Sequence, residues 1–211
     1  MPITPRQQEA RKSKIGSSDS PAICGLSPYR NALNVYLDKV HERADQNADP
    51  IHILMGNYFE PGLLRLAADD LGVEIIQNQS RVSHANKLFG ANHDALVKGK
   101  PEGIEAKVAL QQNDEWGEIG TDQVPMNVFV QCQHQMFVSQ LDKVWVTALV
   151  QGKFRADWRI YEIPREDQVI KAIVEKGELF WNDHVLPKIP PEDMVVDPQV
   201  YRRLVREPRS V

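Results

Sequence analysis

Residues 93–108 read His-Asp-Ala-Leu-Val-Lys-Gly-Lys-Pro-Glu-Gly-Ile-Glu-Ala-Lys-Val, and this stretch decides the fold. Its centre, 98–103, is rich in turn residues and predicts two strands that fold back on each other in antiparallel order. Side chains alternate between the two faces of a strand, so Glu105 and Lys107 project from the same side of the second strand. Asp94 on the first strand then lies near Glu105. The spacing therefore predicts two carboxylates and one ammonium group at a single place on a sheet.

Two carboxylates beside a lysine form a site of hard oxygen ligands, which Mg²⁺ prefers. The lysine adds a cation that can hold a water molecule or a phosphate. These groups are the minimum equipment for metal-assisted hydrolysis of a phosphodiester. Glu-x-Lys also occurs on strands as a solvated surface with a weak ion pair. The motif alone therefore does not choose between an enzyme and a structural strand.

Length and composition predict one globular domain. The chain has 211 residues, of which 42% are hydrophobic and 26% charged, and this is enough for a single elaborated domain over 1–211. We place its core at about 11–185 and a C-terminal tail at 186–211. No apolar run is long enough to span a bilayer, and the first residues lack the apolar core of a signal peptide. Cys24 and Cys132 show no metal-ligand spacing and are expected to be buried thiols. These features favour a cytoplasmic protein.

The net charge of −4 argues against a general nucleic-acid coat protein. It is compatible with a DNA enzyme whose basic residues line one channel while its exterior is acidic. The basic residues do gather near the two ends of the chain, at 6–14 and 202–209. We interpret the second group as a solvated tail.

Periodicity and turn residues predict a mixed α/β (α+β) fold with a central sheet flanked by helices. The pattern indicates helices over 32–40, 53–71 and 125–140 and a last helix from about 164. Pro61 must either kink the second of these or lie in its first turn. Strands are expected at 73–76, 81–83, 143–150 and 154–163, the last two joined by a hairpin at 151–153.

Four segments, in order, resemble the PD-(D/E)xK nuclease superfamily with its restriction-endonuclease-like core. More narrowly, they resemble the phage-recombination exonucleases of the lambda exonuclease or YqaJ type. The segments are 15–29 (IGSSDSPAICGLSPY), 56–61 (GNYFEP), 90–97 (GANHDALV) and 131–138 (QCQHQMFV), and the resemblance covers roughly residues 11–140. His93 stands where this family usually has proline, and we interpret it as a structural residue. Several motifs in the right order are far more specific than any one of them.

The resemblance implies metal-dependent catalytic roles for five positions. Asp94 is expected to bridge two metal ions, since each of its oxygens can hold one cation. Glu105 and the carbonyl of Ala106 are expected to complete one metal's ligands, and Glu60 to reach in as an outer or second-metal ligand. Lys107 is expected to orient the attacking water, with a pKa lowered by the neighbouring metal ions. The metal is expected to be Mg²⁺, two ions per site, with Mn²⁺ as the alternative.

Three further positions are assigned by the resemblance. Gln131 is expected in the catalytic site, where it cannot titrate and therefore positions other groups. Arg11 and Ser18 have the spacing of the family's 5′-phosphate pocket, in which a guanidinium and a hydroxyl hold the phosphate. Ser18 is alternatively, or also, a helix cap. Gln133 and Gln135 need not follow Gln131 into the site, because steps of two residues point away from each other on a helix.

The residues that would part the DNA strands ahead of the site are expected near Leu26, Pro28 and Tyr29. The family resemblance implies a homotrimeric ring that threads double-stranded DNA ends and digests the 5′-ended strand. The 3′ single strand would serve a single-strand annealing protein in phage-type recombination, in a bacterial cell that carries the phage or prophage.

Three alternatives remain open from the sequence. A restriction-like or nicking endonuclease of the same fold would cut closed circles. A non-catalytic DNA-binding protein would have kept the fold without the chemistry. The presence of Asp94, Glu105 and Lys107 argues against this alternative. A small-molecule metallohydrolase lacks support, because the sequence has no His/Cys ligand cluster.

Overall fold

The computed structural model describes residues 12–40, 50–77, 82–84, 87–109, 114–152 and 155–192. Arg11 and the basic residues at 202–209 lie outside the described residues. None of the helices in the described part of the chain combines the length and the apolar character needed to cross a membrane.

The central sheet is mixed, as predicted, and has five strands in the order β2-β5-β6-β7-β8. The strands are β2 (Ile75–Gln77), β5 (Ala95–Val97), β6 (Glu102–Ala109), β7 (Lys143–Gln151) and β8 (Ala156–Pro164). Within this sheet β6 and β7 run parallel, and the other three neighbouring pairs run antiparallel. The predicted antiparallel pairing within residues 93–108 is confirmed, with Ala95 opposite Ile104. The turn at 98–101 therefore brings the start of β5 beside Ile104, near the start of β6.

A second, smaller sheet was not predicted. It consists of β1 (Ile15–Gly16), β4 (Phe89–Ala91) and β3 (Val82–Ser83), in the order β1-β4-β3. β1 and β4 run parallel, with Ile15 opposite Phe89. The segment 90–97 is therefore not one strand, because residues 92–94 separate β4 from β5. Asp94 lies in that break and not on a strand.

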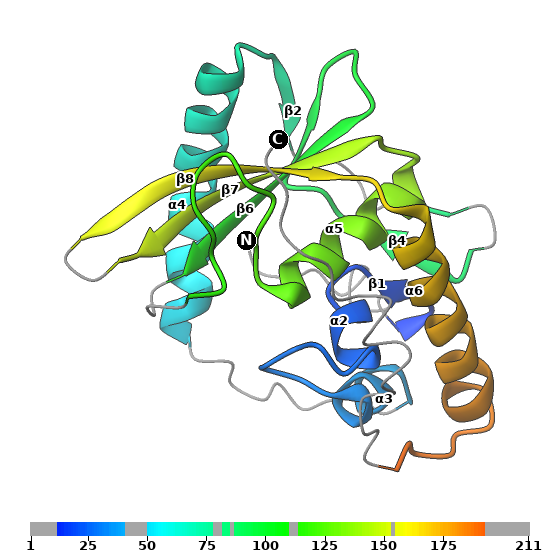
Figure 1. The fold of residues 1–211 in the computed structure, drawn as a ribbon. Coiled ribbons are helices and arrows are strands. Elements are labelled where there is room, and N and C mark those ends of the chain that lie inside the picture. Colours follow the sequence, from blue (N-terminus) through cyan, green and yellow to red (C-terminus); the bar gives the residue numbers. More distant parts are fainter. Residues whose placement is uncertain are drawn as a thin grey trace.

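Helices cover both faces of the central sheet (Figure 1). The described helices are α2 (Ser20–Ile23), α3 (Ala32–Val40), α4 (Pro50–Leu71), α5 (Met126–Ser139) and α6 (Asp167–Phe180), and α6 continues into the π-helical turn η1 (Trp181–Val185). Of these, α4 and α5 cover the two faces of the central sheet, whereas α2 packs on α5 and α3 packs on η1. α4 buries Leu64 against Ile104 of β6, whereas α5 buries Val130 against Val144 of β7. Because side chains alternate along a strand, the even-numbered Ile104 and the odd-numbered Glu105 belong to opposite faces of β6.

The predicted helices hold with local corrections. α3 spans the predicted residues. α4 runs past Pro61, which lies well inside it and not in its first turn, and Gly72 ends it with φ +62°. α5 starts after Pro125, as predicted. α6 starts at Asp167 and not near Pro164, because Pro164 is still paired with Lys143 in the sheet.

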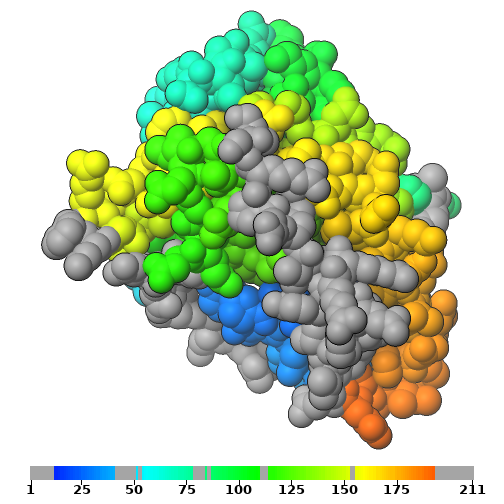
Figure 2. All heavy atoms as spheres, in the orientation of Figure 1, coloured from blue at the N-terminus to red at the C-terminus, as the bar shows by residue number. Residues whose placement is uncertain are grey.

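Residues 114–124 lie on the surface beside the β7–β8 hairpin (Figure 2, green beside yellow). Tyr161 and Arg159 of β8 each donate a hydrogen bond to the carbonyl of Gly117, at 2.9 and 3.0 Å. Trp116 packs its ring against Tyr161, with 5.6 Å between the centroids. These contacts fix residues 114–124, the described part of the connection between β6 and α5, against β8.

Candidate active site

Asp94 reaches β6 from the bend that precedes β5. Its Oδ2 accepts a hydrogen bond from the backbone nitrogen of Ala106 at 2.8 Å. Ala106 lies between Glu105 and Lys107, so this bond holds the carboxylate of Asp94 beside the Glu105-Ala106-Lys107 segment of β6. The structure thus brings Asp94 to β6 as the sequence predicted, with a bend in place of a strand.

Glu105 is the centre of the site and is only 4% exposed. Its Oε1 accepts hydrogen bonds from Lys107 Nζ at 2.7 Å and from Gln131 Nε2 at 2.6 Å. Its Oε2 accepts one from Gln135 Nε2 at 2.6 Å. Lys107 Nζ also donates to Gln131 Oε1 at 3.0 Å. Both oxygens of this buried carboxylate are therefore satisfied, which burial of a charge requires.

Gln135 belongs to the site although the sequence interpretation set it aside. The interval that mattered is the four residues from Gln131, which places both amides on the same face of α5. Gln133 points elsewhere, as expected: its amide donates to the Pro164 carbonyl at 2.8 Å and accepts from the Glu166 nitrogen at 2.9 Å. The i, i+4 spacing was a usable signal for Gln135.

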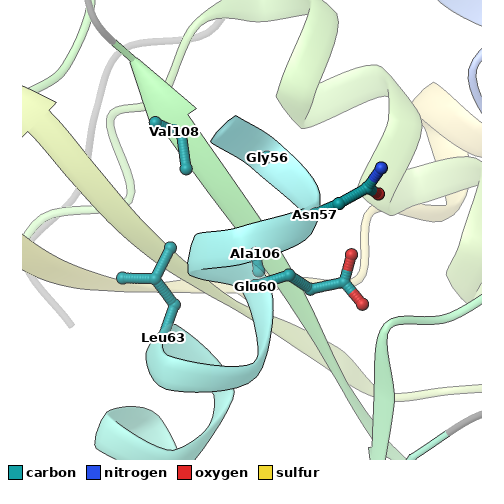
Figure 3. A pocket seen from close by; sticks show the side chains of 6 residues that line it. All are labelled: Gly56, Asn57, Glu60, Leu63, Ala106 and Val108. Carbon is teal, nitrogen blue, oxygen red and sulfur yellow. The ribbon is translucent and has the colours of Figure 1, made fainter. Parts of the chain in front are cut away.

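Glu60 approaches the same strand from α4. It lines a pocket of about 240 Å³ together with Gly56, Asn57, Leu63, Ala106 and Val108. Figure 3 shows Asn57 and Glu60 pointing to the same side of α4, whereas Leu63 points away from them. Glu60 and Ala106 thus line the same pocket, and the nitrogen of Ala106 holds Asp94.

Burial and neighbouring negative charge raise the pKa of two carboxyl groups of the site, Asp94 and Glu60. Burial raises the pKa of Asp94 well above its ordinary value, and the charges of Glu105 and Glu60 raise it further. Burial also raises the pKa of Glu60, with Glu105 as the next cause. Negative charge is therefore gathered here at a cost to the folded protein, which is typical of functional sites.

The pKa of Lys107 is shifted in the opposite direction to the sequence prediction. Burial lowers it, but the charge and hydrogen bond of Glu105 and the charge of Asp94 outweigh burial and raise it above its ordinary value. The protein's own groups therefore keep Lys107 as an ammonium ion. A lowered pKa depends on cations beside it and stays a prediction.

The donor set fits a hard divalent cation. Among the described residues, no three His, Cys, Asp or Glu side chains are already arranged as a metal cluster. The acidic side chains that meet at β6 nevertheless supply carboxylate oxygens, which are ligands that Mg²⁺ and Mn²⁺ prefer. A cation among them would relieve the repulsion that raises the pKa of Asp94 and Glu60.

The predicted phosphate pocket is described only in part, since Arg11 lies outside the described residues. Ser18 is exposed in the turn between β1 and α2. It is not the helix cap, because Asp19 occupies the N-cap position of α2. The buried carboxylate of Asp19 accepts hydrogen bonds from the Gly16 nitrogen at 2.9 Å and from Lys39 Nζ at 2.6 Å, and so fixes the turn that presents Ser18.

The predicted strand-separating residues differ in exposure. Leu26 is partly buried and packs against the main core, whereas Pro28 is exposed and Tyr29 is 84% exposed. His93 is buried, and its Nε2 is 2.6 Å from Ser139 Oγ of α5. This contact agrees with the interpretation of His93 as a structural residue.

Comparisons with known proteins agree with this architecture. Residues 7–142 match the model of the YqaJ-like viral recombinase domain. The uncharacterized protein YqaJ of Bacillus subtilis strain 168 is 26% identical over 180 residues, which are 83% of this chain and 54% of that protein. The chain thus spans about half the length of this curated relative.

Two solved exonuclease structures share the fold. The alkaline exonuclease LHK-Exo from Laribacter hongkongensis superposes with a TM-score of 0.65 at 17% identity, covering 88% of this chain and 94% of that one. A phage-related exonuclease from Haemophilus somnus 129PT gives 0.59 at 14% identity, covering 80% and 92%. At these identities the similarity establishes the fold, which is the mixed sheet flanked by helices that the sequence predicted.

Proposed function

The chain belongs to the YqaJ-like viral recombinase family, and on that premise we propose that it is a Mg²⁺-dependent 5′→3′ exonuclease acting on double-stranded DNA. It digests the 5′-ended strand and leaves a 3′ single strand for an annealing protein in phage-type recombination. The observation that carries this proposal is the convergence of Asp94, Glu105 and Lys107 on one place in β6, with Glu60 beside them. The fold shared with two exonucleases supports it.

In this proposal Asp94, Glu105 and the carbonyl of Ala106 hold the first Mg²⁺, and Glu60 serves a second ion. A bound divalent cation supplies electrophilic assistance to the phosphodiester and stabilises the charge that develops during hydrolysis. Mn²⁺ has the same preference for oxygen ligands and is the alternative ion.

The chain's own residues hold and orient the reacting groups. Lys107, kept charged by Glu105, donates hydrogen bonds to a water molecule or a phosphate oxygen. Gln131 fixes that ammonium group, because its Oε1 accepts from Lys107 while its Nε2 donates to Glu105. The two contacts also determine the orientation of the Gln131 amide, since one needs an acceptor and the other a donor.

The 5′-terminal phosphate is proposed to bind Arg11 and Ser18, which gives the enzyme its polarity. Leu26, Pro28 and Tyr29 are proposed to part the strands ahead of the site. A homotrimeric ring around the duplex accounts for processive digestion by a chain with net charge −4, because topology can retain DNA where general attraction is weak. The proposed setting is the cytoplasm of a bacterium that carries the phage or prophage.

The decisive experiment uses three DNA substrates: a linear duplex with a 5′-phosphate, the same duplex with a 5′-hydroxyl, and a closed circle. Each is incubated with Mg²⁺ and with EDTA. The expected result is loss of the linear forms only, fastest with the 5′-phosphate and abolished by EDTA. Mn²⁺ in place of Mg²⁺ tests the choice of ion, and native mass spectrometry tests the trimer.

Other results would replace the proposal. Cutting of the closed circle would indicate a restriction-like or nicking endonuclease. No cleavage of any substrate, together with retained binding to linear duplex, would indicate a non-catalytic DNA-binding protein. Equal rates on the 5′-phosphate and 5′-hydroxyl duplexes would contradict the proposed binding of the 5′-phosphate by Arg11 and Ser18.

A further inference from the structure

One face of α5 presents three polar side chains at four-residue intervals, and all three contact the site or its support. Gln131 bonds Glu105 and Lys107, Gln135 bonds Glu105, and Ser139 bonds His93. Residues i, i+4 and i+8 of a helix lie in one row along its surface. The row therefore runs from β6 to the bend that carries Asp94.

Gln135 has the contacts that connect these two parts. Its Nε2 donates to Glu105 Oε2 at 2.6 Å and to the backbone carbonyl of Asn92 at 3.2 Å. Both partners accept hydrogen bonds only, so the amide nitrogen must face them and the orientation of the side chain is fixed. The side chain is also almost fully buried, with 1% of the residue exposed.

The bend at 92–94 depends on such contacts for its position. It lies between β4 and β5 and outside the strands of both sheets. Three side-chain hydrogen bonds hold it: Gln135 to the carbonyl of Asn92, Ser139 to His93, and Asp94 to the nitrogen of Ala106. Of these, only the Gln135 amide also holds Glu105.

We propose that Gln135 is a positioning residue that sets the placement of Glu105 relative to Asp94, so that both carboxylates can bind one divalent cation. The proposal rests on the function proposed above and adds a residue to it. Gln135 acts through Glu105 and the bend, and it touches neither DNA nor the reacting atoms. Groups that orient metal ligands typically change metal affinity or activity roughly 10–100-fold when they are removed.

The surroundings favour this role over a purely structural one. Replacing a buried ion pair, such as Glu105 with Lys107, by apolar residues of similar volume is often neutral or stabilising, so stability alone does not require this polar cluster. Gln133 offers the contrast within the same helix: it is fully buried and bonds only backbone groups at the end of β8 and the start of α6. It ties elements together without touching a carboxylate.

The test compares Gln135→Met with the matched control Gln133→Met, which removes the same amide from a buried position of the same helix. Mn²⁺ alone, titrated by calorimetry into each full-length variant without DNA, gives the affinity. Thermal unfolding gives the stability of each, and digestion of linear duplex at varied Mn²⁺ gives the concentration for half-maximal rate.

The expected result is a roughly 10–100-fold weaker Mn²⁺ affinity for Gln135→Met and a matching rise in half-maximal Mn²⁺. Gln133→Met is expected to lower the unfolding temperature without changing Mn²⁺ affinity. Gln135→Asn, whose shorter side chain cannot reach both acceptors, is expected to show a smaller loss of affinity and serves as the test variant if Gln135→Met does not fold.

Equal Mn²⁺ affinities in the Gln135 and Gln133 variants would overturn the positioning role, even if the wild-type chain digests DNA as proposed. A clear difference in Mn²⁺ affinity, with wild-type protein that leaves every DNA substrate intact, would support the positioning role and overturn the proposed exonuclease. The two proposals therefore fail by different results.

Discussion

At the scale of single residues, the folded protein disfavours the ionised form of a carboxyl group in the site. Asp94 has a pKa raised well above its ordinary value, first by burial and then by the charge of Glu105. A carboxyl group whose pKa is higher in the folded than in the unfolded protein destabilises the fold once it ionises. The carboxylates therefore reduce stability in return for a site that attracts a cation.

Asp94→Asn should stabilise the protein and remove its nuclease activity. The asparagine Oδ1 can still accept the hydrogen bond from Ala106, while the charge is gone. In a chain of this size about 1 kcal/mol shifts the unfolding temperature by roughly 2–4 °C, and we expect a rise on this scale at neutral pH. Activity should fall by more than about 100-fold, beyond the usual effect of an outer-shell partner.

The pH dependence gives the sign of this effect. Below 3.8, the ordinary pKa of Asp94, the carboxyl group is protonated in both states, so wild type and Asp94→Asn should unfold at similar temperatures. The difference should open as pH rises above 3.8, where the unfolded chain ionises first, and should stop growing once pH exceeds the raised pKa of Asp94 in the folded protein. Thermal unfolding across this range measures it. A less stable Asp94→Asn at neutral pH would contradict the interpretation.

Lys107→Met should abolish activity, and Lys143→Met is its matched control. Both lysines lie on strands, are about a quarter exposed, and bond a glutamate at 2.7 and 2.6 Å. Lys107→Met removes a hydrogen bond from buried Glu105 and should cost about 1–3 kcal/mol of unfolding free energy. Lys143→Met affects the more exposed Glu162 and should cost at most about 1 kcal/mol. Denaturant unfolding and DNA digestion check both, and an active Lys107→Met would refute the assigned role.

At the scale of elements, the small sheet is positioned by close packing against α6. A Cβ on Gly177 would lie 2.8 Å from Cε1 of Phe89 and 3.2 Å from Cδ1 of Ile15. Phe89 and Ile15 are paired in β4 and β1 and are both fully buried. Because β4 leads directly into the bend at 92–94, the glycine in α6 helps to determine where Asp94 begins its approach to β6.

Gly177→Ala should therefore destabilise the protein although alanine is the better helix former. Forcing an extra methyl group into a packed core costs about 1–3 kcal/mol, which exceeds the gain of about 1 kcal/mol in helix propensity. Gly62→Ala in α4 is the control, since a Cβ there would meet no described atom within 4 Å, and it should stabilise by about 0.5–1 kcal/mol. Chemical denaturation of both variants measures the change in the free energy of unfolding, which should have opposite signs in the two. Two stabilising substitutions would contradict the close packing.

At the scale of the whole molecule, acidic side chains carried by different elements come together at β6. α4 brings Glu60 to one side of β6, and α5 supports Glu105 from the other. A ligand that binds only the folded chain stabilises all of it by mass action. Cation binding should therefore be visible in global stability.

Mg²⁺ or Mn²⁺ should raise the unfolding temperature of the wild-type protein in the absence of DNA. At about one hundred times the dissociation constant the gain is about 2.7 kcal/mol. The rise should be lost in Asp94→Asn, which removes one ligand, and retained in Lys143→Met, which lies away from the site. Calorimetric unfolding at increasing cation concentration measures it. An equal rise in wild type and Asp94→Asn would place the binding elsewhere.

The sequence was most informative where the interactions are local. The turn at 98–103 joins strands that are neighbours in the chain, so the antiparallel pairing of β5 and β6 followed from composition alone. Alternation placed Glu105 and Lys107 on one face, and their 2.7 Å contact confirms it. The bounds of α3 followed from its apolar spacing, and Pro125 marked the start of α5.

By itself the sequence determined the fold class, the family and the grouping of Asp94 with Glu105 and Lys107, because turns, alternation and motif order are properties of short segments. Tertiary structure alone decided the parallel pairing of β1 with β4, the bend at Asp94 and the part played by Gln135. The Gln135 contacts join residues 30 and 43 positions apart. The four-residue spacing from Gln131 indicates only which helix face carries Gln135. Which groups that face meets depends on how whole helices and sheets pack, and no local pattern in one sequence specifies that packing.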